Sequence, residues 1–425
     1  MRYRISVLFV LAILLLTGVS FLIPSRPARS SENRTMATFD MVFAPRKDSV
    51  VYRDSPAERF DLALSDQFPC REFWIKNHAR LFDFLENTIR RSAKAFMPKK
   101  PGAMLHAVGG YEMIGDTGYL TRYPRTAPLN RKLLRKHVKQ IEYLHTKFPD
   151  LKFYVYYISQ AYDAPWIEAY TGIRPADRYR EIADLLPDYV KSGRLVYRDL
   201  RDYMNLHYKT DHHWNHRGAR RGYEDIFAMM SPDLEMGKLR LPESENPVSR
   251  SYDFGYLGSY GRILGELYKG GYDEFSFYEY RLPRRKSAIL DLNSRKEIPA
   301  VEMGLYDEYR AGRINRDIGE DHYTTLYGTA RDVNGRSVVE TGLYIIRSSE
   351  GNGRNLLLCG DSFSRALRDV LASHFDTTVY FDYRLLSGIP VDAVIERYKI
   401  DVLLISSHLS MWGVDRYFFT FGRER

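Results

Sequence analysis

Short apolar runs alternate with amphipathic runs over the last quarter of the chain, and this alternation constrains the fold more than any other feature. The apolar runs predict strands over residues 355–359, 377–381 and 401–405, and the amphipathic runs predict helices over 364–374 and 391–398. Strands separated by helices pair in parallel through right-handed crossovers. The sequence therefore predicts an α/β protein whose parallel sheet is flanked by helices.

The same alternation occurs earlier in the chain. Residues 129–147 predict an amphipathic helix, 151–158 a buried strand, 177–191 a helix and 194–200 another strand. Residues 231–345, which lie between the two α/β stretches, are crowded with Tyr, Phe, Gly and Arg. We interpret this stretch as an insertion or a smaller, aromatic-rich subdomain.

The amino-terminal segment, residues 5–23, carries no charge and follows a short basic stub. As a helix it is about 28 Å long, which matches the hydrocarbon thickness of a bilayer and exceeds the apolar core of a typical signal peptide. We therefore expect residues 1–24 to form an uncleaved signal anchor, residues 25–55 a linker and residues 56–425 the folded domain. In this interpretation residues 24–425 lie outside the cytoplasm.

Composition excludes several classes of protein. A chain of 425 residues with 44% hydrophobic residues can bury a large core, which excludes intrinsic disorder. The formal net charge of +9 includes four arginines in the first thirty residues, and the remaining surplus is too diffuse to indicate nucleic-acid binding. Cys70 and Cys359 are the only cysteines, so a disulfide framework and a multi-cysteine zinc site are excluded. Whether these two cysteines pair is left open.

Two polar segments occur at predicted strand ends. Residues 360–364, Gly-Asp-Ser-Phe-Ser, lie where a strand turns into a helix. A serine at such a turn projects at the carboxyl edge of the sheet, and N–H groups of the next helix can stabilise an oxyanion. The second segment, residues 210–216, contains Asp211 and His213. A histidine can accept the proton of Ser362 while a carboxylate orients it, so the two segments predict a nucleophilic triad.

Both segments also have other interpretations. Ser362 could serve only to cap its helix. A metal site is the second alternative, because imidazole and carboxylate are ordinary zinc ligands. Its candidate ligands are His207, Asp211, His212, His213 and His216. The position of both segments at strand ends of one predicted sheet favours the nucleophile. We assign His212 no catalytic role, because it points away from His213 if the segment is extended.

The motifs Asp211-His212-His213-Trp214 and Gly360-Asp361-Ser362-Phe363 resemble the DHHW protein family, which is similar to the SGNH-hydrolase-like proteins of bacterial alginate O-acetylation. Nearly the whole chain shares the resemblance, which extends in the same order to residues 32–34, 66–71, 258–259 and 382–384. Ordinary SGNH hydrolases carry the Ser motif first and leave two residues between Asp and His. Here the order is reversed and the gap is one residue, as in the alginate-type subgroup.

The resemblance implies an SGNH-hydrolase-like fold and a membrane-anchored, extracytoplasmic enzyme. Ser362, His213 and Asp211 would form its catalytic triad, without a cofactor or metal. Such proteins are linked to acetylation of a secreted or cell-envelope polysaccharide. A separate membrane-bound O-acyltransferase would supply the acetyl groups, and the anchored protein would place them on sugar hydroxyls.

Three functions remain open at this point. The first is an O-acetyltransferase that forms an acyl-serine intermediate, and the second is a carbohydrate O-acetyl esterase with the same triad. The third is a catalytically silent glycan-binding or scaffold protein. A large separation between His213 and Ser362 would favour the third function over the other two.

Three more side chains are candidates for contact with a glycan. Arg384 follows a predicted strand and could reach the same sheet edge as Ser362, or it could pair with a neighbouring aspartate. Tyr383 and Trp214 could stack on sugar faces. Aromatic residues are so common in this chain that core packing is the default interpretation for both.

Overall fold

The structure is a computed structural model, and it describes most of the chain after residue 110. The described residues are 38–40, 56–69, 105–108, 111–250, 256–264, 268–291, 295–302, 330–331, 342–382 and 390–413, with single positions before residue 105. No helix within these residues is long and apolar enough to cross a membrane. The predicted anchor, residues 5–23, lies outside the described residues apart from Leu15 and Gly18.

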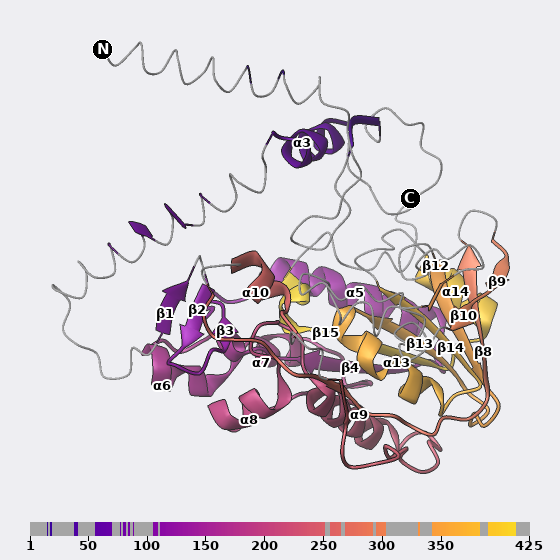
Figure 1. Cartoon of the computed structure of the whole chain (residues 1–425). Coiled ribbons are helices and arrows are strands. Elements are labelled where there is room, and N and C mark those ends of the chain that lie inside the picture. Colours follow the sequence, from indigo (N-terminus) through magenta and orange to yellow (C-terminus); the bar gives the residue numbers. More distant parts are fainter. Residues whose placement is uncertain are drawn as a thin grey trace.

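An eight-stranded sheet forms the centre of the fold (Figure 1). In spatial order its strands are β5 (Val190–Arg194), β4 (Lys152–Ile158), β15 (Val402–His408), β13 (Asn355–Gly360), β14 (Thr377–Asp382), β12 (Gly342–Ser348), β8 (Arg285–Asp291) and β9 (Glu297–Pro299). The first five pair in parallel, and the last three extend the sheet with antiparallel pairs. The predicted α/β class and its central sheet are confirmed.

Helices cover both faces of this sheet (Figure 1). On one face lie α9 (His216–Met230) and α13 (Arg365–Ala372), and on the other lie α5 (Arg131–Lys147) and α14 (Val391–Tyr398). Alternate residues of β13 point to the two layers, so Leu358 packs with α9 and α13 while Leu357 packs with α5 and α14. Burial on both faces explains why the central strands are continuous apolar runs.

Two predicted elements are wrong in extent. The helix expected over 177–191 ends early, because α7 spans only Arg178–Ala183. Pro187 follows it, and proline disfavours a helical residue before it. The strand expected over 194–200 is displaced, since β5 is Val190–Arg194. Only Val190 in β5 is a large apolar residue, which is why the apolar pattern missed this edge strand.

The predicted insertion, residues 231–345, contains α10 (Ser259–Leu264) and the paired strands β6 (Val248–Arg250) and β7 (Phe275–Phe277). It also contributes β8, β9 and part of β12 to the central sheet. A separate three-stranded sheet consists of β1 (Leu105–Val108), β2 (Tyr111–Ile114) and β3 (Leu120–Thr121).

The order of the strands determines where a ligand can bind. From β13 the chain crosses through α13 to β14, and then through α14 to β15 on the other side of β13. This reversal of direction is a topological switch point, and open α/β sheets usually bind ligands beyond the carboxyl ends of the strands at such a point, here β13 and β15. Cys359 lies near that end of β13 but is a buried free thiol, and Cys70 lies outside the described residues.

Candidate active site

Ser362 is held at the carboxyl end of β13 by a tight turn. Asp361 fixes this turn, because its Oδ1 accepts the N–H of Phe363 at 3.0 Å and its Oδ2 accepts the N–H of His408 at 2.7 Å. Gly360 is needed just before it, since a Cβ there would lie 2.3 Å from Ser364 Oγ. The turn leads into the short 3₁₀ helix η5 (Ser362–Ser364), which is followed by α13.

His213 and Asp211 come from the bend between α8 (Leu200–Leu206) and α9. The side chain of Asp211 accepts the backbone N–H of His213 at 3.0 Å and faces its Nδ1 at 2.8 Å. Because Nδ1 faces a carboxylate, it carries the hydrogen and leaves Nε2 as an acceptor. Nε2 lies 2.7 Å from Ser362 Oγ. The structure thus brings the three predicted residues into one hydrogen-bonded chain.

A segment far along the chain holds Asp211 from the other side. The hydroxyl of Tyr256 donates to Asp211 Oδ2 at 2.6 Å, and the N–H of Ser259 donates to the same oxygen at 2.8 Å. Gly258 permits this close approach, since a Cβ there would lie 2.3 Å from the Asp211 Cβ. Burial alone would raise the pKa of Asp211, but the two neighbouring histidines hold that pKa well below its usual range.

Asp273 holds the backbone just before Asp211 by hydrogen bonds. Its carboxylate accepts the backbone N–H groups of Lys209 and Thr210, at 2.8 and 2.9 Å. Thr210 in turn accepts the N–H of Gly258 on its Oγ1 at 2.8 Å. Burial raises the pKa of Asp273 to about 6. These bonds tie the segment that carries Asp211 to the segment that carries Tyr256.

The expected orientation of His212 is wrong. The segment bends, so the His212 ring lies beside that of His213, with a centroid separation of 3.9 Å. Its Nδ1 is 2.8 Å from Ser259 Oγ and 3.0 Å from Asp211 Oδ1. A period-2 pattern applies only to an extended chain, and the sequence offered no signal of the bend.

Asp211, His212 and His213 lie close enough together to satisfy the metal hypothesis geometrically, with one ligand atom each within 4.8 Å of the others. The donors around them disfavour it. Both carboxylate oxygens of Asp211 already accept hydrogen bonds from N–H and O–H groups, which a cation would have to displace. His207 is directed to Tyr197, and His216 packs on Tyr278.

The three predicted glycan contacts have different outcomes. Trp214 is fully buried and packs against Phe363, with a centroid separation of 5.7 Å. A Cβ at Gly222 would lie 2.6 Å from the Trp214 ring, so the indole is in close contact with this glycine. The prediction that Trp214 stacks on a sugar face therefore does not fit its position, because the ring is core. Tyr383 and Arg384 lie outside the described residues.

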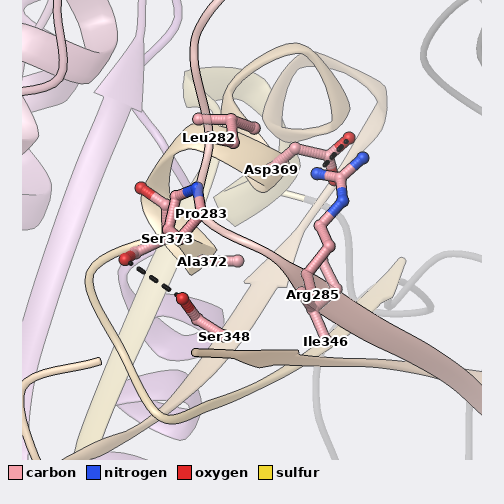
Figure 2. Close-up of a pocket in the computed structure, with 8 residues that line it drawn as sticks. All are labelled: Leu282, Pro283, Arg285, Ile346, Ser348, Asp369, Ala372 and Ser373. Atoms are coloured by element: carbon pink, nitrogen blue, oxygen red, sulfur yellow. Dashed lines mark hydrogen bonds and ion pairs between the residues drawn. The ribbon is translucent and has the colours of Figure 1, made fainter. Parts of the chain in front are cut away.

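Figure 2 shows a pocket between β8, β12 and the carboxyl-terminal half of α13, and Ser362 is not among the residues that line it. Arg285 and Asp369 form an ion pair there at 3.4 Å, and Ser348 Oγ donates to the carbonyl of Ser373 at 3.5 Å. The enclosed space between these side chains is too small to hold a water molecule, so it is not a ligand site. We therefore place the candidate active site at Ser362 and not at this pocket.

Comparison with known proteins identifies the same fold. No family model and no curated protein matches the sequence. Among solved structures, a DHHW family protein from Eubacterium siraeum covers 75% of this chain and 97% of its own, with 14% identity and a TM-score of 0.53. Bacillus cereus PatB1, solved with a sulfonyl adduct, covers 72% of this chain and 98% of its own, with 16% identity and a TM-score of 0.52. The predicted resemblance to the DHHW family is thus confirmed as a shared fold.

Proposed function

We propose that this protein is an O-acetyltransferase that acetylates hydroxyl groups of a secreted or cell-envelope polysaccharide. The observation that carries this conclusion is the hydrogen-bonded chain from Ser362 through His213 to Asp211. A base 2.7 Å from a serine oxygen can take its proton without rearrangement. This distance favours an enzyme over a catalytically silent glycan-binding or scaffold protein.

The reaction proceeds in two acyl transfers. His213 Nε2 takes the proton of Ser362 while Oγ attacks the acetyl carbonyl of the donor, and the protonated His213 returns that proton to the leaving group. Acetyl-Ser362 results. In the second transfer His213 deprotonates a sugar hydroxyl, the sugar oxygen bonds to the acetyl carbon, and Ser362 Oγ leaves with the proton. Asp211 stabilises the imidazolium that forms in each step.

The backbone N–H of Ser362 is the donor best placed for the oxyanion. Ser362 is the first residue of the 3₁₀ helix η5, so no carbonyl within that helix can accept its N–H. The next N–H, that of Phe363, is already directed to Asp361. A donor on the nucleophile's own residue lies beside the carbonyl that Ser362 attacks, where negative charge develops.

The setting of the reaction is proposed from the sequence. Residues 5–23 would anchor the chain in the membrane with residues 24–425 in the cell envelope. A membrane-bound O-acyltransferase would supply the acetyl group, and Arg384 and Tyr383 would contact the polysaccharide. An O-acetyl esterase differs only in that water replaces the sugar in the second transfer, so product analysis distinguishes the two enzymes.

Intact mass after treatment with 4-nitrophenyl acetate tests this function. The full-length chain in detergent should gain one acetyl group, and Ser362→Ala should lose the adduct with a fall in 4-nitrophenol release of at least about 10³-fold. A sulfonyl fluoride should label the same residue, a probe suggested by the sulfonyl adduct of PatB1. Ser348→Ala, at the pocket of Figure 2, is the matched control and should acetylate normally.

The acceptor is identified by adding an oligosaccharide to the acetylated protein. Acetyl groups on sugar identify a transferase, and free acetate alone identifies an esterase. Acetylation of folded Ser362→Ala at the parental rate would rule out the mechanism.

A further inference from the structure

We propose that His212 binds a hydroxyl of the acyl acceptor beside the ester on Ser362. It would thereby favour acceptors that carry two neighbouring hydroxyl groups over simple alcohols. This inference rests on the proposed acyl transfer at Ser362 and identifies the residue that selects the acceptor.

The contacts of His212 fix which nitrogen is the acceptor. Its Nδ1 lies 2.8 Å from Ser259 Oγ and 3.0 Å from Asp211 Oδ1. The serine hydroxyl donates its own hydrogen to Asp211, at 3.3 Å. Nδ1 therefore faces two acceptors and carries the hydrogen, so Nε2 has a free lone pair.

This Nε2 is available to a ligand. A third of the His212 side chain is exposed, 33%, whereas the His213 side chain is only 5% exposed. Within the described part of the chain, His212 hydrogen bonds through Nδ1 and Nε2 has no protein partner. The two adjacent imidazoles thus differ in exposure, because His213 Nε2 is directed to Ser362 and His212 Nε2 is open.

The surrounding residues hold the His212 ring in place. Gln160 Nε2 donates to the His212 carbonyl at 2.8 Å and fixes its backbone. The ring lies near Tyr260 and Phe363, at centroid distances of 5.7 and 5.8 Å. A side chain that is already oriented loses little conformational entropy when it binds, which suits a positioning contact for a ligand.

The second acyl transfer can use both histidines at once. The attacking hydroxyl gives its proton to His213 Nε2, its oxygen bonds to the acetyl carbon, and the bond from that carbon to Ser362 Oγ breaks as Oγ takes the proton. The neighbouring hydroxyl of the same acceptor donates to His212 Nε2. A simple alcohol has one hydroxyl hydrogen, which passes to His213, and it cannot also donate to His212, so His212 favours transfer to a diol over transfer to a simple alcohol.

Competition between two acceptors tests this selection. The full-length protein in detergent is acetylated with 4-nitrophenyl acetate in the presence of trans-cyclohexane-1,2-diol or cyclohexanol, and each acetyl ester is measured against free acetate. This ratio does not depend on how fast acetyl-Ser362 forms. His212→Asn keeps an N–H near Ser259 but lacks Nε2, so its preference for the diol should fall about tenfold, the effect of one neutral hydrogen bond.

His212→Phe keeps a ring in the same place without either nitrogen and should lose the same preference, which separates this role from packing. An unchanged diol preference in both variants overturns the inference alone. Loss of the acetyl-enzyme in both variants also overturns it, because His212 would then serve the first transfer. If the parent protein forms no acetyl-enzyme, the proposed function fails as well.

Discussion

Asp211 is a buried, ionised carboxylate, and its neighbours explain how the fold tolerates it. One oxygen faces both groups of His213 that can donate, the backbone N–H and Nδ1, and the other accepts from Tyr256 and Ser259. A buried charge is stable only when its hydrogen-bonding capacity is met. The same bonds leave Asp211 one orientation, which aims His213 at Ser362.

We predict that Tyr256→Phe slows acetylation of Ser362 about tenfold and lowers stability by roughly 1.5–3 kcal/mol, the effect of one hydrogen bond to a charge. Without the Tyr256 hydroxyl, Asp211 is a stronger base and keeps His213 protonated to higher pH. The acidic limb of the pH–rate profile should therefore move to higher pH. Stopped-flow release of 4-nitrophenol across pH measures both effects.

Tyr119→Phe is the matched control for this prediction. It removes the same atom from a nearby tyrosine whose hydroxyl donates to the Met204 carbonyl at 2.6 Å and does not contact Asp211. It should cost about 1 kcal/mol of stability and leave the pH profile in place. A pH profile of Tyr256→Phe that coincides with that of the parent would contradict the role of Tyr256.

The sequence predicts some of these residues and not others for a physical reason. Ser362, His213 and Asp211 stand in short motifs at the ends of predicted elements, where side-chain chemistry and topology point the same way. Ser259 is marked only by the family resemblance of residues 258–259, and Tyr256 lies in an aromatic-rich stretch without periodicity. Both residues reach Asp211 only through the tertiary fold. The burial of Trp214 agrees with core packing, its default interpretation, and not with the alternative contact to a sugar face.

At the scale of elements, close backbone approach assembles the site. The segment that carries Tyr256 and Ser259 can contact Asp211 only because Gly258 has no side chain. We predict that Gly258→Ala lowers stability by about 1–3 kcal/mol, as overpacking does, and slows acetylation at least tenfold because Asp211 must move. Thermal unfolding and the 4-nitrophenol burst measure the two effects.

Gly193→Ala is the control, because a Cβ at Gly193 in β5 would make ordinary contacts with Met229 and Tyr156, at 3.4 and 3.5 Å. Its stability should stay within about 1 kcal/mol of the parent, with a normal burst. Parental stability and acetylation in Gly258→Ala would show that the segment can shift without displacing Asp211.

The strands that are buried on both faces of the sheet could be predicted from the sequence. Strands β4 and β13 lie between two helical layers and read as unbroken apolar runs, so the sequence located them closely. β5 lies at the sheet edge and carries Lys191, Ser192 and Arg194, so its pattern resembles a loop. The apolar residues Leu195 and Tyr197 that suggested a later strand are buried beyond its end.

At the scale of the whole molecule, buried histidines outside the triad make the stability of the fold depend on pH. These histidines are not part of the hydrogen-bonded chain from Ser362 to Asp211, and burial keeps their rings neutral. Burial lowers the pKa of His207 to about 3, and it lowers the pKa values of His216 and His374 to about 4. Unfolding exposes all three, so stability must depend on pH.

The sign of this dependence follows from His374. Between pH 6.5 and about 4 the unfolded chain binds a proton at this side chain and the folded chain does not, so acid favours unfolding. Each such histidine should cost about 1.4 kcal/mol per pH unit over that range. His374→Gln should therefore flatten the fall in melting temperature between pH 6.5 and 4.5.

Tyr223→Phe is the control, because it removes only the hydroxyl that lies 2.8 Å from His374 Nε2. It should lower stability while the slope of melting temperature against pH remains. If His374→Gln and the parent lose stability equally across this range, His374 is not one of the groups that couple folding to pH.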